Sequence, residues 1–308
     1  MEEVADGVIR VTFDLPLGID HVHCYFLRAS SGGWTLVDTG LGSRDPEEKW
    51  RPVLDELDAP VERIVVTHMH PDHVGGARDV ADLTGAPVLQ GREDYAQCVS
   101  AWGADRSLPR LAGWWESHGL PAGQAEAMRQ EADNLGRAVH WVRDPQLLDE
   151  GDTVDDWRVG VLRGHADGHI VLSRGDVMIA GDTILGGITP AIGQYPNSRP
   201  DPLGDYLETL DRIEAMQLSL ALTGHKHRLR DPSARAREIR AHHHDRLVAA
   251  EAALGDAPRT AYEVSLELFE AELSPVLRRF ALAEALAHLE RLVVTDRAVR
   301  ADGGYTAR

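Results

Sequence analysis

The chain has 308 residues, 43% of them hydrophobic, which is enough for one large or two modest domains with buried cores. Its 32 basic and 50 acidic residues give a net charge of −18, which argues against a protein built to bind nucleic acid. No apolar run reaches the roughly 18 residues of a membrane span, the start lacks a secretory signal, and two cysteines make no disulfide framework; we therefore expect a cytoplasmic protein without membrane contact.

Short apolar runs bounded by turn residues predict β-strands along much of the first 222 residues. We expect strands at 8–13, 24–27, 34–37, 64–66, 88–89, 157–162, 170–173, 177–179 and 218–222. Helices are expected to begin near Pro46 and near His73. The pattern indicates a mixed α/β domain over residues 1–232.

A helical insert interrupts the strand pattern at about 94–143 and carries four of the seven tryptophans. Ligand pockets are concave and mostly apolar, so we expect Trp114 and Trp115 to roof a substrate pocket. The alternative is that these rings only pack the insert onto the body. Tyr195 and His23 are further candidate pocket residues.

Residues 233–308 are rich in alanine, leucine and arginine and contain no further cluster of the ligand types discussed below. Helical periodicity predicts three helices followed by a hairpin with a glycine-rich turn. We expect the helices at 235–254, 261–269 and 276–292 and the hairpin at 293–305. The run His242–His244 is interpreted as a solvated helix face, and no metal is assigned to it.

The strongest chemical signal is a group of four metal-ligand side chains within six residues, His68, His70, Asp72 and His73. It directly follows an apolar strand, and mixed nitrogen and oxygen ligands suit zinc, manganese or iron. His165, Asp182 and His225 also lie just beyond apolar runs, as does Asp38. Strand ends that converge on one edge would bring these residues into one site.

In this order, the residues resemble the signature of the metallo-beta-lactamase superfamily, with an early Asp-Thr-Gly turn at 38–40. The resemblance implies an α/β fold, the αβ/βα sandwich of that family, and two divalent metal ions, with zinc favoured over manganese or iron. It assigns one metal to His68, His70 and His165, and the other to Asp72, His73 and His225. Asp182 would bridge the two ions, and Asp38 and His169 would hold ligands in place from behind.

The same resemblance implies a hydrolase. We expect a small acyl substrate, an ester, thioester or lactone, to be attacked by a metal-bound hydroxide that Asp72 orients. A metal-dependent endoribonuclease and an iron-dependent dioxygenase are the alternatives. Three helices and a hairpin after such a domain resemble the winged-helix tail of lactamase-beta-2-like hydrolases, which we expect to serve as a pocket wall or a homodimer surface.

Overall fold

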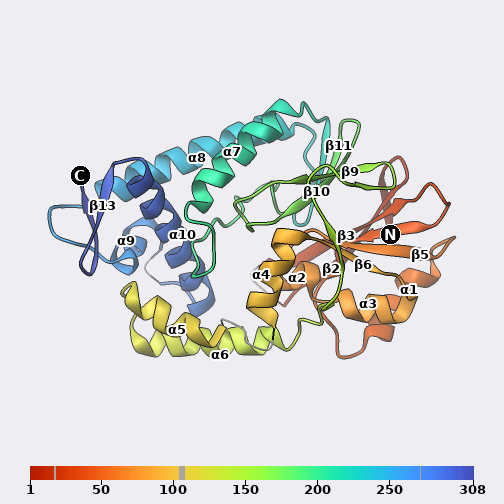
Figure 1. The fold of residues 1–308 in the computed structure, drawn as a ribbon, viewed down its shortest axis with the longest axis horizontal. Helices are drawn as coiled ribbons and strands as arrows, with labels where there is room; N and C mark the ends of the chain where they lie inside the picture. The colour runs from red at the N-terminus through yellow and green to blue at the C-terminus, as the bar shows by residue number, and fades with distance from the viewer. Residues whose placement is uncertain (17–18, 104–107, 271) are drawn as a thin grey trace.

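The computed structural model describes residues 1–16, 19–103, 108–270 and 272–308. Two β-sheets pack face to face between outer layers of helices, and a helical C-terminal region extends from one end (Figure 1). The predicted αβ/βα sandwich is therefore confirmed. Within the described ranges, no helix combines the length and the apolar character needed to cross a membrane.

The first sheet has seven strands that lie side by side in chain order. They are β1 (Glu2–Ala5), β2 (Val8–Asp14), β3 (His21–Arg28), β4 (Trp34–Val37), β5 (Val61–Val66), β6 (Val88–Gly91) and β7 (Gln146–Leu148). Strands β4 to β7 run parallel to one another, so their carboxyl ends lie at the same edge. The segments that follow β4 and β5 begin at that edge with Asp38 and Thr67.

The second sheet has five strands in the order β12-β11-β10-β9-β8. They are β8 (Thr153–Val154), β9 (Trp157–Val161), β10 (Ile170–Arg174), β11 (Val177–Gly181) and β12 (Leu220–Thr223). Strand β11 is parallel to β12 and antiparallel to β10, which is antiparallel to β9. The carboxyl ends of β9, β11 and β12 therefore also share one edge.

Helices cover the outer faces of both sheets and build the insert and the C-terminal region (Figure 1). They are α1 (Pro46–Asp55), α2 (Pro71–Val74), α3 (Ala77–Thr84), α4 (Arg92–Trp102), α5 (Leu108–Ser117), α6 (Ala122–Gly136), α7 (Pro202–Ala215), α8 (Pro232–Ala252), α9 (Ala261–Leu268) and α10 (Pro275–Val294). The hairpin β13 (Ala298–Ala301) and β14 (Gly304–Ala307) ends the chain. The three helices predicted for the C-terminal region are present, and so is the hairpin, but it begins at Ala298 and not at 293 because Val293 and Val294 still belong to α10.

The hydrophobic core falls into three parts. One lies between the two sheets and includes Tyr25, Val65 and Ile179. A second packs the first sheet against α1 and α3, around Trp50. The third joins the second sheet to α7, to the C-terminal helices and to the insert, so that α5 and α6 lie beside α10 (Figure 1). The C-terminal region thus shares its core with the sandwich and the insert.

Trp115 lies in this shared core with 1% of its surface exposed. Truncation of a fully buried tryptophan leaves a large cavity, so we expect Trp115→Ala to lower the free energy of unfolding by about 3–5 kcal/mol. Urea denaturation checks the value. Trp114→Ala should cost less, because Trp114 is only partly buried; an equal loss from both variants would contradict this assignment.

The prediction of a solvated face at His242–His244 is wrong for His243, which is fully buried. Its ring packs against Tyr206 and forms a hydrogen bond with His288. The cause lies in the helical period: Ile239, His243 and Leu247 are spaced four residues apart and face the same core.

Candidate metal centre

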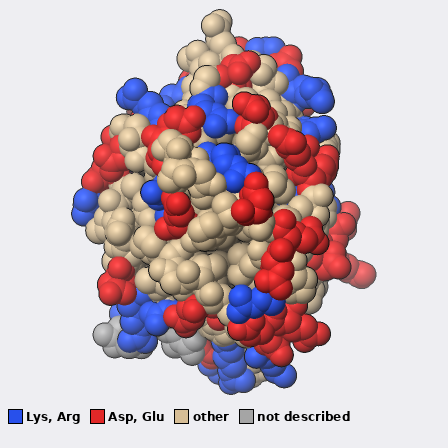
Figure 2. Space-filling model, turned by 90° about the vertical axis from the view of Figure 1, so that its right-hand side faces the viewer, with Lys and Arg blue, Asp and Glu red and all other residues tan. Residues whose placement is uncertain are grey.

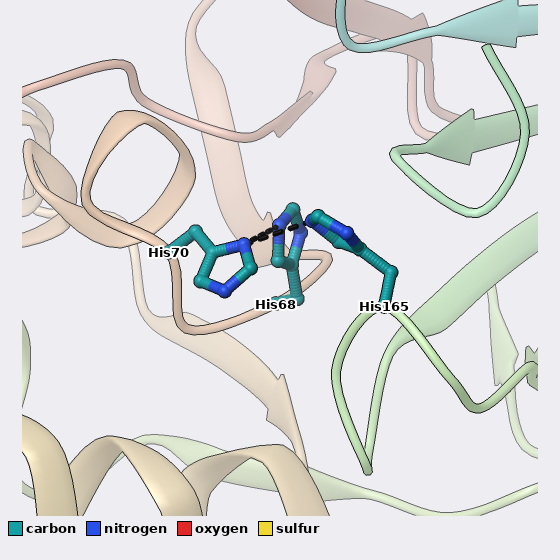
Figure 3. A group of neighbouring side chains, drawn as sticks. All are labelled: His68, His70 and His165. Atoms are coloured by element: carbon teal, nitrogen blue, oxygen red, sulfur yellow. Dashed lines mark hydrogen bonds between the residues drawn. The ribbon is translucent and has the colours of Figure 1, made fainter. Parts of the chain in front are cut away.

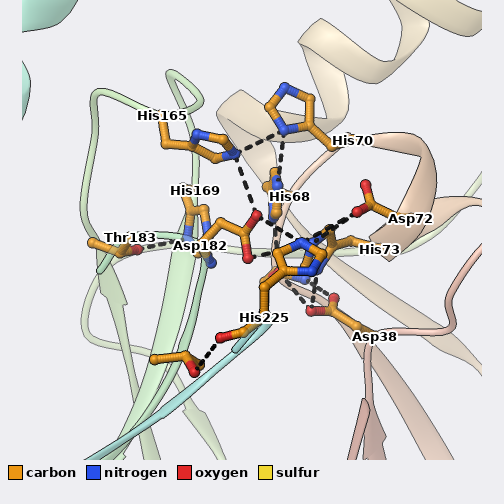
Figure 4. Close-up of polar contacts among 12 residues, drawn as sticks. Asp38, His68, His70, Asp72, His73, His165, His169, Asp182, Thr183 and His225 are labelled. Atoms are coloured by element: carbon orange, nitrogen blue, oxygen red, sulfur yellow. Dashed lines mark hydrogen bonds and ion pairs between the residues drawn. The ribbon is translucent and has the colours of Figure 1, made fainter. Parts of the chain in front are cut away.

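The candidate centre lies where the carboxyl edges of the two sheets meet. Backbone hydrogen bonds join the sheets there, from Ile170 N to Thr67 O (2.9 Å) and from His23 N to Gly224 O (2.7 Å). These bonds fix the loops after β5, β9, β11 and β12 relative to one another. Their side chains converge on one point from segments more than 150 residues apart in the sequence (Figure 4).

His68, His70 and His165 form the first cluster, and their rings point toward one another from two different loops (Figure 3). His68 Nε2 lies 3.0 Å from His70 Nδ1, which lies 2.9 Å from His165 Nε2. Two nitrogen ligands at 2.0–2.1 Å from a tetrahedral cation would be about 3.3 Å apart. The three nitrogens are therefore spaced closely enough to share one ion.

Asp72, His73 and His225 form the second cluster. Asp72 Oδ2 lies 3.2 Å from His225 Nε2 and 3.9 Å from His73 Nε2. The short helix α2 carries Asp72 and His73 on adjacent residues, and the loop after β12 brings His225 to them.

Asp182 lies between the clusters (Figure 4). Its Oδ2 is 3.1 Å from His225 Nε2 and 3.7 Å from His165 Nε2, and its Oδ1 is 3.5 Å from His73 Nε2. A single carboxylate thus approaches ligand nitrogens of both groups. The structure brings together all seven residues that the sequence singled out as metal ligands.

Hydrogen bonds at the far side of three imidazoles fix which nitrogen faces the centre. His165 Nδ1 donates to Ala191 O (2.9 Å), His225 Nδ1 to His21 O (2.6 Å) and His73 Nδ1 to Asp38 Oδ2 (2.8 Å). A backbone carbonyl or carboxylate oxygen can only accept a hydrogen bond. In each of these rings Nδ1 therefore carries the proton, and Nε2 can offer its lone pair. This is the arrangement found behind metal-bound histidines.

The two ends of the site differ in electrostatics. Burial, together with His73 and His169, holds the pKa of His68 well below its ordinary value, and burial with His165 lowers that of His70 to about 3. At the other end, burial alone would lower the pKa of His225, but the Asp182 and Asp72 carboxylates outweigh it and raise it to about 10. Negative charge is therefore concentrated there, and cations would balance it.

Three buried atoms in the centre, His73 Nε2, Asp182 Oδ1 and His225 Nε2, make no well-aligned hydrogen bond among the described residues, although oppositely charged groups lie 3.1–3.5 Å away. Such orphaned polar atoms are costly unless a ligand satisfies them. Gly224 leaves room for these side chains, because a Cβ at this position would lie 2.3 Å from Asp182 Oδ1 and 2.7 Å from His73 Cε1. The donor set and its spacing fit divalent transition-metal ions.

Asp38 and His169 lie behind the candidate ligands and contact them. Asp38 has a positive φ of 61°, a strained backbone for a residue other than glycine, and its carboxylate accepts hydrogen bonds from Thr67 N, Thr67 Oγ1 and His73 Nδ1. His169 Nε2 accepts from Asp182 N (3.1 Å), and its ring stacks on His68.

We expect Asp38→Asn to weaken metal binding by about 10- to 100-fold, because the amide replaces an acceptor by a donor next to His73 Nδ1 or Thr67. Competition with a chromophoric chelator measures this. Asp79→Asn is the matched control, since Asp79 also accepts from a histidine, His140 Nδ1 at 2.8 Å, but outside the centre. Equal affinities for the two variants would refute the positioning role of Asp38.

Sequence reasoning missed Asp94, which supports the loop that carries His68 and His70. Its carboxylate is fully buried and accepts hydrogen bonds from Met69 N (2.9 Å) and Gln90 Nε2 (2.6 Å). Trp102 Nε1 donates to Met69 O (2.9 Å) from the other end of α4. Both backbone groups of the residue between His68 and His70 are therefore fixed by α4.

The candidate pocket residues do not join the ligand cluster. His23 uses both ring nitrogens within the fold, with Thr12 Oγ1 at 2.9 Å and Lys226 O at 2.8 Å, and burial lowers its pKa to about 4. Trp114 contacts Trp115, whose ring lies 5.9 Å from that of Tyr195. The aromatic rings pack the insert against the loop after β11 and the C-terminal core. Contact of these four residues with a substrate stays a prediction.

Two family models match the chain. The one described as the metallo-beta-lactamase superfamily covers residues 17–225, and the one described as the metallo-beta-lactamase-like C-terminal domain covers residues 247–306. Among curated proteins, the probable metallo-hydrolase YqjP of Bacillus subtilis (strain 168) is 24% identical over 307 residues, which are 93% of this chain and 92% of that protein.

Solved structures extend the likeness over the whole chain. A metallo-beta-lactamase family protein of Thermus thermophilus is 33% identical with a TM-score of 0.85, and the match covers 99% of both chains. A beta-lactamase domain protein of Burkholderia ambifaria is 31% identical with a TM-score of 0.88, over 100% of this chain and 94% of that one. The similarity therefore includes the C-terminal region as well as the sandwich.

Proposed function

The chain belongs to the metallo-beta-lactamase superfamily and is a hydrolase of that fold, and on this premise we propose that it uses two divalent metal ions to hydrolyse an ester, thioester or lactone. The observation that carries the proposal is Asp182, whose carboxylate lies within 3.7 Å of His165 Nε2 and 3.1 Å of His225 Nε2, nitrogens of the two separate clusters. A carboxylate in this place can hold a cation on each side.

Each residue of the centre has a role in this proposal. His68, His70 and His165 hold one ion, Asp72, His73 and His225 hold the other, and zinc fits these nitrogen and oxygen donors. Two bound ions would polarise the scissile carbonyl and lower the pKa of a water molecule. Asp72 would also orient that water from the end of the site where the second ion is proposed, since its Oδ2 lies 3.2 Å from His225 Nε2 and 3.9 Å from His73 Nε2.

Charge favours an acyl substrate over RNA. The net charge is −18, and a protein that binds a phosphate backbone gains affinity from a concentrated basic surface. On the face shown in Figure 2, Lys and Arg side chains are interspersed with Asp and Glu, and the residues described there form no continuous basic patch. A neutral or weakly charged acyl group makes no such demand.

A panel of substrates tests the proposal. The protein is stripped of metal, reloaded with zinc, manganese or iron separately, and assayed with esters, acyl-thioesters, lactones, a phosphodiester and short RNAs. We expect metal-dependent hydrolysis of an ester, a thioester or a lactone, and no cleavage of RNA. Turnover of RNA alone would replace the proposal by the endoribonuclease, and oxygen consumption by only the iron-loaded protein would replace it by the dioxygenase.

A further inference from the structure

A second group of metal-ligand side chains lies in the C-terminal region, away from the centre described above. It consists of His243 on α8 and of Glu284 and His288 on α10. One ligand atom from each residue lies within 4.8 Å of the others. Both histidines are fully buried, and Glu284 is half-buried. The assigned chemistry of the protein uses none of the three.

The hydrogen bonds of His288 resemble those behind the histidines of the main centre. Its Nδ1 donates to the backbone oxygen of Glu284 at 2.7 Å, so its neutral ring has an unprotonated Nε2. That Nε2 lies 3.2 Å from Nδ1 of His243. The separation is close to the roughly 3.3 Å expected for two nitrogen ligands of one tetrahedral cation.

Glu284 and His288 are four residues apart on α10, so both side chains project from one face of the helix toward α8. Among the described residues, no hydrogen bond or ion pair reaches the carboxylate of Glu284, which is half-buried. Arg246 is the nearby cation, but its guanidinium donates to Leu268 O and lies over the Phe269 ring. The carboxylate therefore has no fixed positive partner.

The surroundings are the apolar core shared by α8, α10 and the second sheet. An unpaired carboxylate and two imidazoles are unfavourable there unless their polar atoms are satisfied. His243 Nε2 is buried without a hydrogen-bond partner in the described chain, and Nδ1 is the nitrogen that faces His288 Nε2, so an ion between the two rings would be held by Nδ1. The cluster thus places two buried imidazoles and a half-buried carboxylate beside a well-packed apolar region.

We propose that His243, Glu284 and His288 form a separate binding site for one divalent transition-metal ion, with zinc as the ion that suits two imidazoles and a carboxylate. The ion would cross-link α8 to α10 and leave one coordination position for water. The competing arrangement is a plain hydrogen bond between two neutral imidazoles, which would bind no metal.

Metal content tests the proposal with zinc alone as the probe. Full-length protein is incubated with excess Zn²⁺, separated from free ions by gel filtration and analysed by mass spectrometry. We expect Glu284→Gln and His288→Gln each to carry one zinc ion fewer per chain than the unchanged protein. His244→Gln is the control, because His244 is an exposed neighbour on the same helix and should lose none. Equal zinc content in all four proteins would overturn the proposal.

A crystallographic measurement on the unchanged chain removes any dependence on how the variants fold. Anomalous scattering at the zinc absorption edge should show a peak between α8 and α10 in addition to any signal at the Asp182 centre. Peaks at the Asp182 centre alone would overturn the proposal. The peak between α8 and α10 does not depend on the Asp182 centre or on activity. A missing peak would therefore refute the second site without bearing on the proposed hydrolase.

Discussion

Replacement of Asp182 by Asn should leave at most one tightly bound metal ion in the Asp182 centre and lower turnover by several orders of magnitude. Asparagine keeps the shape of the side chain but removes the negative charge that lies between the two clusters. The amide also places a donor near His73, His165 or His225, whose nitrogens lie 3.1–3.7 Å from the present carboxylate oxygens. The substitution therefore acts on both proposed ions at once.

Asp167→Asn is the matched control for this experiment. Asp167 is a buried carboxylate two residues after His165, but its Oδ2 accepts a hydrogen bond from Arg199 N at 3.0 Å and is no part of the cluster. We expect that variant to keep its metal content and most of its activity. Metal analysis and steady-state rates decide the matter, and an Asp182→Asn protein with full metal content and near-normal turnover would refute both the bridge and the two-metal mechanism.

The convergence of the candidate ligands could be predicted from the sequence because they lie shortly after apolar runs. Buried strands in both sheets make these runs visible, and parallel neighbours such as β4 and β5, or β11 and β12, bring their carboxyl ends to the same edge. Helix α7 carried a signal that was not used: Asp201 caps it and Pro202 follows, as Asp45 and Pro46 do at α1.

Other features depend on contacts that no local pattern records. Asp94 looks like an ordinary acidic residue in the first turn of a helix, and only the packing of α4 against the ligand loop reveals its hydrogen bond to Met69. Strand β1 was missed because it is short, lies at the sheet edge and begins with two glutamates. The role of Trp115 likewise follows from the contact of the insert with the C-terminal core, which lies far away in the sequence.

Removal of metal by a chelator should abolish activity and lower the stability of the fold together. The ligands come from four loops, and three buried atoms of the centre make no well-aligned hydrogen bond among the described residues. An ion that binds only the folded chain adds RT ln(1 + [L]/Kd), about 4 kcal/mol when the free ion is at a thousand times its Kd. Thermal unfolding of stripped and zinc-loaded protein measures the difference, and equal melting temperatures would contradict the expectation.

Two controls assign the effect to the proposed centre. Magnesium prefers oxygen ligands in octahedral geometry, so it should restore neither the melting temperature nor the activity, whereas zinc should restore both. Glu284→Gln removes a ligand of the cluster between α8 and α10 and leaves the Asp182 centre intact. In that variant zinc should still restore activity. The rise in melting temperature that zinc still produces can then be assigned to the Asp182 centre, because the loops of the two sheets meet there.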